Sequence, residues 1–377
     1  MKPLYFDYNA TTPVHDRVLQ AMLPSFKEAY GNPGCLHPWG LAARETVERA
    51  RGRLAAFVGA GPEEIVFTSG ATESDNWALL GLFPDFKGHV VISAVEHPAV
   101  FEPARWLADQ GVTLTVVPVD SQGLVDPADV RRACRADSRL VSIMLANNEV
   151  GTIQPLAEIA AWCRERNILV HTDAAQAVGK IPVRVDELRV DLMSVAGHKM
   201  YAPKGVGALY IRSGIRLNPI FRGGGQEHGL RPGTENVAFM AALGQAAALA
   251  DEDLEAEANR QRDLGQQFLE GLGRCPRPFV LHSNEAPRLP GTMSVAFPGL
   301  RAGDILSGLL AREVAVSAGA ACHSGQVRMS RVLEAMGVAP DTGQGTIRFS
   351  WGRMINARDV DELLDRLGET LAELGPT

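Results

Sequence analysis

The sequence predicts an α/β fold, with a large domain built on a mostly parallel, seven-stranded sheet and a smaller C-terminal α/β domain. From residue 65 onward, short apolar runs alternate with helical segments, a pattern typical of a parallel sheet with helices on both faces. A connector rich in Gly and Pro at residues 221–233 closes this region. The Ala- and Glu-rich stretch at about 235–272 then predicts a long helix that leads into the second domain.

The elements of the large domain follow from its apolar periodicity. Strands are expected at residues 65–67, 90–93, 113–119, 140–145, 168–172, 192–195 and 207–211. Helices are expected between them, near residues 72–82, 98–109, 127–135 and 155–166. Ahead of this region, apolar residues recur at helical spacing after Pro38, at Val47, Ala50, Leu54 and Phe57. This spacing predicts an amphipathic helix that packs on a larger unit.

The C-terminal part is expected to contain strands near residues 293–297 and 346–350 and helices near residues 303–312 and 357–373. The N-terminal stretch at residues 5–13 is turn-rich and too short to fold alone. The expected division is a large domain over residues 14–255 and a small domain that combines residues 1–13 with residues 256–377.

Composition and charge exclude several classes of protein. With 377 residues, of which 46% are hydrophobic and 21% charged, the chain can bury a sizeable core. Its net charge of −7 provides no basic stripe for nucleic acid. Residues 1–10 are polar and the apolar runs are short, so neither a signal peptide nor a membrane span is expected. Five widely spaced cysteines without a CxxC motif argue against a disulfide framework and a zinc site. These features favour a cytoplasmic protein.

Two strand ends carry a lysine and an aspartate that suit pyridoxal phosphate (PLP). Lys199 follows the expected strand at 192–195, and Asp173 follows the one at 168–172. The chain has six lysines against 31 arginines, and arginine cannot form the imine that holds PLP. The aspartate would hold the proton of the ring nitrogen, so that the ring can act as an electron sink. A solvated loop lysine is the ordinary alternative.

Polar residues also end the other strands. Thr72 follows a glycine turn at a helix start, which favours a phosphate but also fits an ordinary capping box. His97 and Asn148 follow two further strands, where they suit proton transfer and a polar contact to a cofactor. A lone histidine at such a position is also compatible with a simple surface role. Because ligands of open α/β sheets bind beyond the carboxyl ends of the strands, we expect these residues to share one site with Asp173 and Lys199.

Three other segments bear on function. The glycine run at 223–225 is not part of a GxGxxG or GxxxxGK[ST] motif, which argues against a Rossmann dehydrogenase. Cys322 lies among small residues in AGAACHSG at 318–325, which suits an accessible nucleophile on a mobile loop or an incidental thiol. Arg348 lies in a segment that alternates like a strand, where its guanidinium suits a substrate carboxylate or a surface salt bridge.

Together these segments resemble the PLP-dependent cysteine desulfurases, which are class V aminotransferase-like enzymes, and also the closely related selenocysteine lyases. The matching motifs begin with DYNATTP at 7–13, GNP at 31–33, TSGATES at 68–74 and EH at 96–97. They continue through NNEVG, HTDAAQAVGK, GHK, APKGVGALY, GGGQE and RPGTEN to IRFSWGR at 347–353. This resemblance covers nearly the whole chain, and it implies a fold type I PLP enzyme that forms a homodimer with active sites near the subunit interface.

The resemblance also implies roles for the matching residues. The ring of PLP would be held by Lys199, by Asp173 at its nitrogen, by Gln176 at its phenolate oxygen and by His97, which would stack on it and act as acid–base. Its phosphate would be held by Ala71, Thr72 and His198, helped by Thr234 of the partner subunit. The substrate carboxylate would be held by Asn148, which also contacts the cofactor, and by Arg348. Cys322 would attack the substrate sulfur, leaving a persulfide and releasing alanine.

The sequence departs from the housekeeping desulfurases at three points. Ala196 stands where those enzymes often have a phosphate-binding serine, the cysteine loop reads SAGAACHS, as in selenocysteine lyases, and the chain ends at ELGPT without the tail that docks an iron–sulfur scaffold. The expected activity is conversion of L-cysteine to L-alanine, with sulfur passed through Cys322 to an acceptor such as an iron–sulfur scaffold, for cluster assembly or thiolation. The alternatives are a selenocysteine lyase, a sulfur-carrier or scaffold partner with weak turnover, and a PLP aminotransferase, in which the cysteine loop would have no role.

Overall fold

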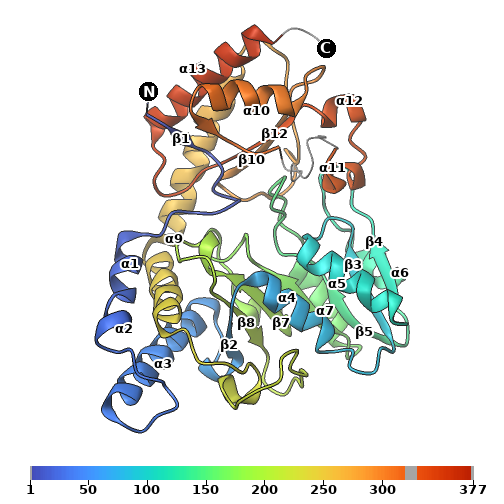
Figure 1. Cartoon of the computed structure of the whole chain (residues 1–377). Helices are drawn as coiled ribbons and strands as arrows, with labels where there is room; N and C mark the ends of the chain where they lie inside the picture. The colour runs from blue at the N-terminus through green and yellow to red at the C-terminus, as the bar shows by residue number, and fades with distance from the viewer. Residues whose placement is uncertain (1, 319–328, 375–377) are drawn as a thin grey trace.

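The computed structural model describes residues 2–318 and 329–374. Its larger sheet has seven strands in the order β2-β8-β7-β6-β5-β3-β4 and lies in the lower half of the molecule in Figure 1. The strands are β2 (Ile65–Thr68), β3 (His89–Ser93), β4 (Thr113–Val117), β5 (Ser138–Ser142), β6 (Leu169–Asp173), β7 (Leu192–Ala196) and β8 (Gly207–Ile211). β8 runs antiparallel to β2 and β7, and the other neighbouring pairs are parallel. The mostly parallel α/β sheet predicted from the sequence is confirmed.

Apart from the edge strand β4, both faces of this sheet are buried, as alternating strand side chains show. On β3, Val91 belongs to one apolar cluster, whereas Val90 and Ile92 belong to another, because successive strand side chains point to opposite faces. The first cluster includes side chains of α3 (Pro38–Val58), α7 (Leu156–Arg164) and α9 (Val237–Leu272). The second includes side chains of α4 (Ala71–Leu80) and α5 (Pro98–Asp109). Burial on both faces accounts for the continuous apolar runs in the sequence.

A three-stranded sheet lies in the upper half of the molecule (Figure 1). β12 (Thr346–Ser350), β10 (Thr292–Ala296) and β9 (Val280–Leu281) are antiparallel neighbours, and α10 (Ala302–Ala311) and α13 (Ala357–Glu373) share their apolar cluster. The start of the chain joins this part. β1 (Leu4–Tyr5) pairs in parallel with β11 (Val314–Ala315), and Phe6 and Tyr8 lie in the same cluster. α9 runs from one half to the other and contains a non-helical residue, Asp253.

The structure differs from the expected elements mainly in the limits of one strand and in several short helices. The strand expected at 140–145 spans Ser138–Ser142 instead. Ile143 and Leu145 still donate backbone hydrogen bonds to the carbonyl oxygens of His171 and Asp173, at 3.1 and 2.9 Å. The short helices were not predicted because one or two turns carry little periodicity. They are α1 (Asp16–Met22), α2 (Pro24–Lys27), α8 (Val185–Leu188), α11 (Arg331–Ala335) and α12 (Pro340–Gly343). The helix expected at 127–135 is α6 (Pro127–Ala133).

None of the helices in the two described ranges combines the length and the apolar character needed to cross a membrane.

Candidate active site

A cavity of about 440 Å³ lies at the carboxyl-terminal ends of β2, β3, β6 and β7 of the larger sheet. It gathers nine of the residues predicted for the site, namely Ala71, Thr72, His97, Asn148, Asp173, Gln176, His198, Lys199 and Arg348. All but Arg348 follow or end strands of this sheet, whereas Arg348 belongs to β12 of the smaller sheet. The cavity therefore lies between the two sheets, and the structure brings together residues that are far apart in the sequence.

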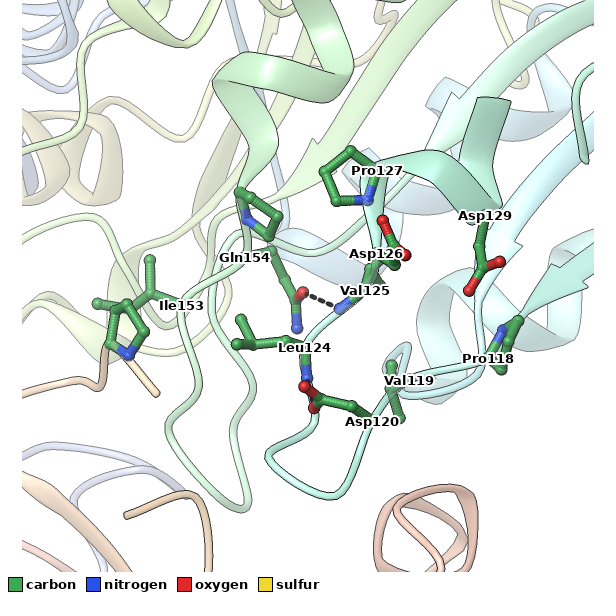
Figure 2. A pocket seen from close by; sticks show the side chains of 12 residues that line it. Pro118, Val119, Asp120, Leu124, Val125, Asp126, Pro127, Asp129, Ile153 and Gln154 are labelled. Carbon is green, nitrogen blue, oxygen red and sulfur yellow. Dashed lines mark hydrogen bonds between the residues drawn. The ribbon is translucent and has the colours of Figure 1, made fainter. Parts of the chain in front are cut away.

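A larger cavity, of about 720 Å³, lies elsewhere (Figure 2). It is formed by residues 118–120, 124–127, 129 and 153–155 together with Pro287. Its carboxylates serve local structure: Asp120 accepts from the backbone of Gln122 and Leu124 at 2.8 and 2.9 Å, and Asp126 caps α6. Its lining, as far as the chain is described, includes no lysine, histidine or cysteine. The smaller cavity is therefore the candidate active site.

Lys199 ends a 3₁₀ turn, Gly197–Lys199, that directly follows β7. A Cβ at Gly197 would come within 2.9 Å of Val206, so this turn requires glycine. The Lys199 amine donates hydrogen bonds to the carbonyl oxygens of Asn9 and Ala10, the latter at 2.7 Å. Burial, with a smaller contribution from Arg348, lowers the pKa of Lys199 to about 8. More of the amine is therefore neutral near neutral pH, and the neutral form is the nucleophile.

Asp173 ends β6, and its carboxylate is buried at the wall of the cavity. Its side chain accepts a hydrogen bond from the backbone N–H of Ala175 at 2.9 Å. Burial, with a smaller contribution from the carboxylate of Asp75, raises the pKa of Asp173 from 3.8 to about 6. A cationic ring nitrogen placed beside it would favour the ionised form. The site therefore suits a ligand that brings a positive charge to Asp173.

We expect Asp173→Asn to stabilise the ligand-free protein while it weakens the site. The native state binds the Asp173 proton more tightly than the unfolded state, so this carboxyl destabilises the fold as pH rises from 3.8 to about 6. This loss of stability is complete above about pH 6 and absent below pH 3.8. At pH 8 the free energy of unfolding of the variant should therefore be roughly 2–3 kcal/mol larger than that of wild type.

Denaturant unfolding of cofactor-free protein at pH 8 and pH 4 measures this difference. The difference should shrink at the lower pH. Asp109→Asn, at an exposed helix end, is the control and should change stability little at either pH. A wild type that is as stable as Asp173→Asn at pH 8 would contradict the raised pKa.

The start of α4 forms another wall of the cavity and offers backbone donors. Its N-cap is Gly70, which has a φ of 151° and no side chain to bond the amides of the first turn. Because the first-turn N–H groups of a helix lack intrahelical partners, they remain available to an anion beside Ala71 and Thr72. The Glu73 carboxylate does not bond the N–H groups of this first turn. It pairs with Arg231 at 2.9 Å and accepts from the Ser69 N–H at 2.8 Å. This arrangement favours the phosphate interpretation over the simple capping box.

Two histidines at the cavity are held in their neutral form. His97 is the N-cap of α5, and its Nδ1 accepts the Ala99 N–H at 3.1 Å, so a neutral ring carries its proton on Nε2. Burial lowers the pKa of His97. His198 contacts the Thr11 hydroxyl at 3.1 Å through Nδ1, and burial lowers its pKa to about 4. In this tautomer His97 can deliver the proton on Nε2, while Ala99 uses the lone pair on Nδ1, and His198 is an uncharged hydrogen-bonding partner.

Arg348 forms a salt bridge with Asp7, but its side chain is buried, so the location of this salt bridge at the surface is wrong. Its guanidinium donates to the Asp7 carboxylate at 2.6 Å and to the backbone oxygen of Asn148 at 3.0 Å. Its buried Nε has no hydrogen-bond partner among the described residues. An unsatisfied guanidinium donor at a cavity suits an incoming carboxylate.

Two predicted residues are not placed in the cavity. Thr234 is exposed and is absent from the described lining of this chain's cavity. Cys322 lies outside the described residues.

The structure also adds residues that sequence reasoning missed. Asn9 and Asp75 line the cavity, and Lys180 hydrogen-bonds to Asn9 and Gln176. Asn9 and Lys180 lie within the quoted motifs DYNATTP and HTDAAQAVGK, which are the signals that could have identified them.

Comparison with known proteins identifies the family. The model of the family described as aminotransferase class-V matches residues 4–363. The chain is 42% identical to "Cysteine desulfurase IscS" of Dictyoglomus turgidum, over 100% of this chain and 97% of that protein. It is also 42% identical to "Cysteine desulfurase, mitochondrial" of Arabidopsis thaliana, over 100% of this chain and 84% of that protein. A solved structure of a NifS-like protein superposes with a TM-score of 0.93 at 39% identity, covering 99% of this chain and 100% of that one. The chain belongs to the aminotransferase class-V family.

Proposed function

We propose that the protein is a PLP-dependent cysteine desulfurase that converts L-cysteine to L-alanine and takes up the sulfur as a persulfide on Cys322. The observation that carries this proposal is the cavity itself, which places Lys199, Asp173 and His97 around one space at the end of the sheet. The relatives described as cysteine desulfurases, about 40% identical over the full chain, support the same activity.

The residues of the cavity fit PLP. Lys199 would hold it covalently, Asp173 would bind the ring nitrogen, and Gln176 the phenolate oxygen. The phosphate would lie at the uncapped start of α4, beside Ala71, Thr72 and His198, and Thr234 of the partner subunit would complete its site. When bound there, PLP supplies an electron sink for the bonds of the substrate α-carbon.

The protein side chains handle the proton and the substrate. His97, neutral at neutral pH, would act as acid–base beside the ring, and the proton on its Nε2 is the one that it would deliver and then recover. Arg348 would hold the substrate carboxylate, and Asn148 would contact both the substrate and the cofactor. Asp7 already orients the Arg348 guanidinium before substrate arrives.

For the sulfur transfer, the thiolate of Cys322 attacks the sulfur of the substrate. A sulfur–sulfur bond forms as the carbon–sulfur bond breaks, and the electron pair of the broken bond stays with the β-carbon. Protonation of that carbon gives alanine, and Cys322 keeps the sulfur as a persulfide. Atoms and electrons balance without an external oxidant or reductant.

We expect Arg348→Lys to lower kcat/KM for L-cysteine by roughly 10- to 100-fold, because lysine cannot present the two-pronged donor that suits a carboxylate. The loss should fall mainly on KM, since the side chain binds the substrate in the proposed role. The absorbance of the bound cofactor should stay as in wild type.

Steady-state kinetics with L-cysteine measure this change. Arg353→Lys is the matched control, because Arg353 follows β12, pairs with Asp253 of α9 at 2.6 Å and is absent from the described lining of the cavity. Equal losses in both variants, or a lost cofactor band in Arg348→Lys, would contradict the substrate role.

We further propose a homodimer. Large apolar side chains are exposed along residues 19–41 of this chain, at Leu19, Leu23, Phe26, Tyr30, Leu36, Trp39 and Leu41. So many large exposed apolar side chains in one short stretch of the chain support an interface there. The exposed Thr234 is free to serve the site of a partner, as the resemblance implies.

The remaining parts of the proposal concern organisation and pathway. We propose a large domain at residues 14–255 and a small domain of residues 1–13 and 256–377, which is supported by the cluster that Leu4, Phe6 and Tyr8 share with residues 264–371. We propose a cytoplasmic protein that passes sulfur to an acceptor such as an iron–sulfur scaffold. The odd number and wide spacing of the cysteines support this location.

The experiment that tests the function is quantification of alanine from purified protein given L-cysteine or L-selenocysteine, without any partner. Alanine from L-cysteine is the expected result. Consumption of selenocysteine alone would instead establish the lyase activity that the motif SAGAACHS suggests. An absence of turnover with both substrates would leave the sulfur-carrier role.

A further inference from the structure

We propose that Lys180 is a positioning residue, which fixes the side-chain amide of Gln176 so that one of its N–H groups faces an acceptor oxygen on the bound cofactor. The proposal rests on the proposed function, because it concerns the PLP site. Gln176 lines the cavity, whereas Lys180 is absent from its described lining. Lys180 would therefore act through Gln176 and not by touching the ligand.

The Lys180 amine is held between two amide oxygens. It donates to Gln176 Oε1 at 2.7 Å and to Asn9 Oδ1 at 2.8 Å. A lysine ammonium only donates, and the NH₂ of an amide does not accept, so both contacts require the oxygen of each amide on the Lys180 side. Lys180 thereby sets the orientation of two side chains at once.

The other end of the Gln176 amide agrees with this orientation. Gln176 Nε2 donates to the backbone oxygen of Asn9 at 2.9 Å, and a carbonyl oxygen can only accept. One N–H of the amide is used by this bond, and the second is left for the cavity. The ligand group that fits an N–H donor is an acceptor oxygen, and an anionic phenolate forms the strongest such bond.

The Asn9 amide shows the same ordering. Its Nδ2 donates to Asn148 O at 3.1 Å and to the Thr292 hydroxyl at 2.9 Å. Lys180 therefore links the N-terminal segment, the loop after β6 and the proposed substrate-binding Asn148. An amide that turned over at either position would lose hydrogen bonds at both of its ends.

The charge of Lys180 is not needed for this role. Burial lowers the pKa of Lys180 well below its ordinary value, and the neighbouring Lys199 and Arg348 lower it further. A neutral amine still carries two N–H groups for the two amide oxygens, and the bonds from Gln176 Nε2 to Asn9 O and from Asn9 Nδ2 to Asn148 O require the same orientation of both amides. The orientation of Gln176 should therefore hold across the working pH range.

The test is the pH titration of the visible absorbance of the bound cofactor in holoenzyme. In Lys180→Met, the phenolate loses a well-oriented donor, so the apparent pKa of the bound cofactor should rise by about one pH unit. Lys180→Arg keeps N–H donors and should titrate close to wild type. Gln176→Ala should shift in the same direction as Lys180→Met, and adding Lys180→Met to it should produce no further shift, because a residue that acts through Gln176 has no effect without it.

A Lys180→Met holoenzyme that titrates as wild type would overturn the proposal, and so would a Lys180→Met shift of the same size in the Gln176→Ala background. If Lys180→Met does not fold, Lys180→Gln serves in its place, since its amide can still donate. A partial shift that disappears in the Gln176→Ala background is then expected. A shift that persists in that background contradicts the proposal. Wild type that binds no PLP and releases no alanine would instead contradict the proposed function, and this inference with it. Intact PLP binding and turnover with unshifted titrations contradict this inference alone.

Discussion

Replacing Lys199 with alanine is expected to remove the visible absorbance of the covalently held cofactor and to lower alanine release from L-cysteine by at least roughly 10³-fold. The amine is placed by the turn after β7 and by the Asn9 and Ala10 carbonyls, and its lowered pKa of about 8 makes it reactive. In the described part of the cavity wall, Lys204 is the other lysine. Absorbance spectra and alanine release under saturating L-cysteine measure both effects.

Lys204→Ala is the matched control, because Lys204 lines the same cavity but is exposed. It should keep the cofactor band and most of the activity. A Lys199→Ala protein with the native spectrum and normal turnover would contradict the assignment of Lys199. Loss of the band in Lys204→Ala with an intact band in Lys199→Ala would transfer the role to Lys204.

Replacing Cys322 with alanine is expected to reduce alanine release from L-cysteine to the detection limit while PLP binding stays intact. In the proposed transfer, this thiol is the group that receives the sulfur as the carbon–sulfur bond breaks. An unperturbed thiol has a pKa of about 8.5, so activity of wild type should rise with pH as the thiolate forms.

Selenium is a better leaving group than sulfur, so the Cys322→Ala variant should keep part of its activity toward L-selenocysteine.

Cys275→Ala is the control for this variant. Cys275 is a free, partly buried cysteine that packs against the apolar cluster of the smaller sheet. Its replacement should leave desulfuration unchanged. Normal turnover of L-cysteine by Cys322→Ala would show that the proposed transfer step is wrong.

The fold was predictable because local pattern and tertiary structure agree in the larger sheet. Strands such as β3 and β7 are buried along their whole length, so most of their residues are apolar on both faces and the strands stand out from the helices. The limits of β5 were predicted less well. The residues after Ser142 keep some hydrogen bonds to β6 while they leave the regular ladder, and apolar content alone does not show where a ladder ends.

The site was predictable where a residue sits at a strand end, as Asp173 and Lys199 do. Contacts between distant segments were not predictable from local pattern. Arg348 is buried against Asp7, which lies 341 residues earlier in the chain, and no spacing rule connects them. The two amides that Lys180 orients include Asn9, 171 residues away. Such pairs are set by how the two sheets meet, and only the folded chain shows them.

The proposed sulfur transfer is tested by the mass of the peptide that contains Cys322, after the purified protein is exposed briefly to L-cysteine without any reductant or acceptor. One added sulfur atom is expected on Cys322, formed in step with one alanine per active site and absent from Lys199→Ala. Alanine that accumulates while Cys322 stays unmodified, or sulfur that appears first on another cysteine, would show that Cys322 does not receive the sulfur from the substrate.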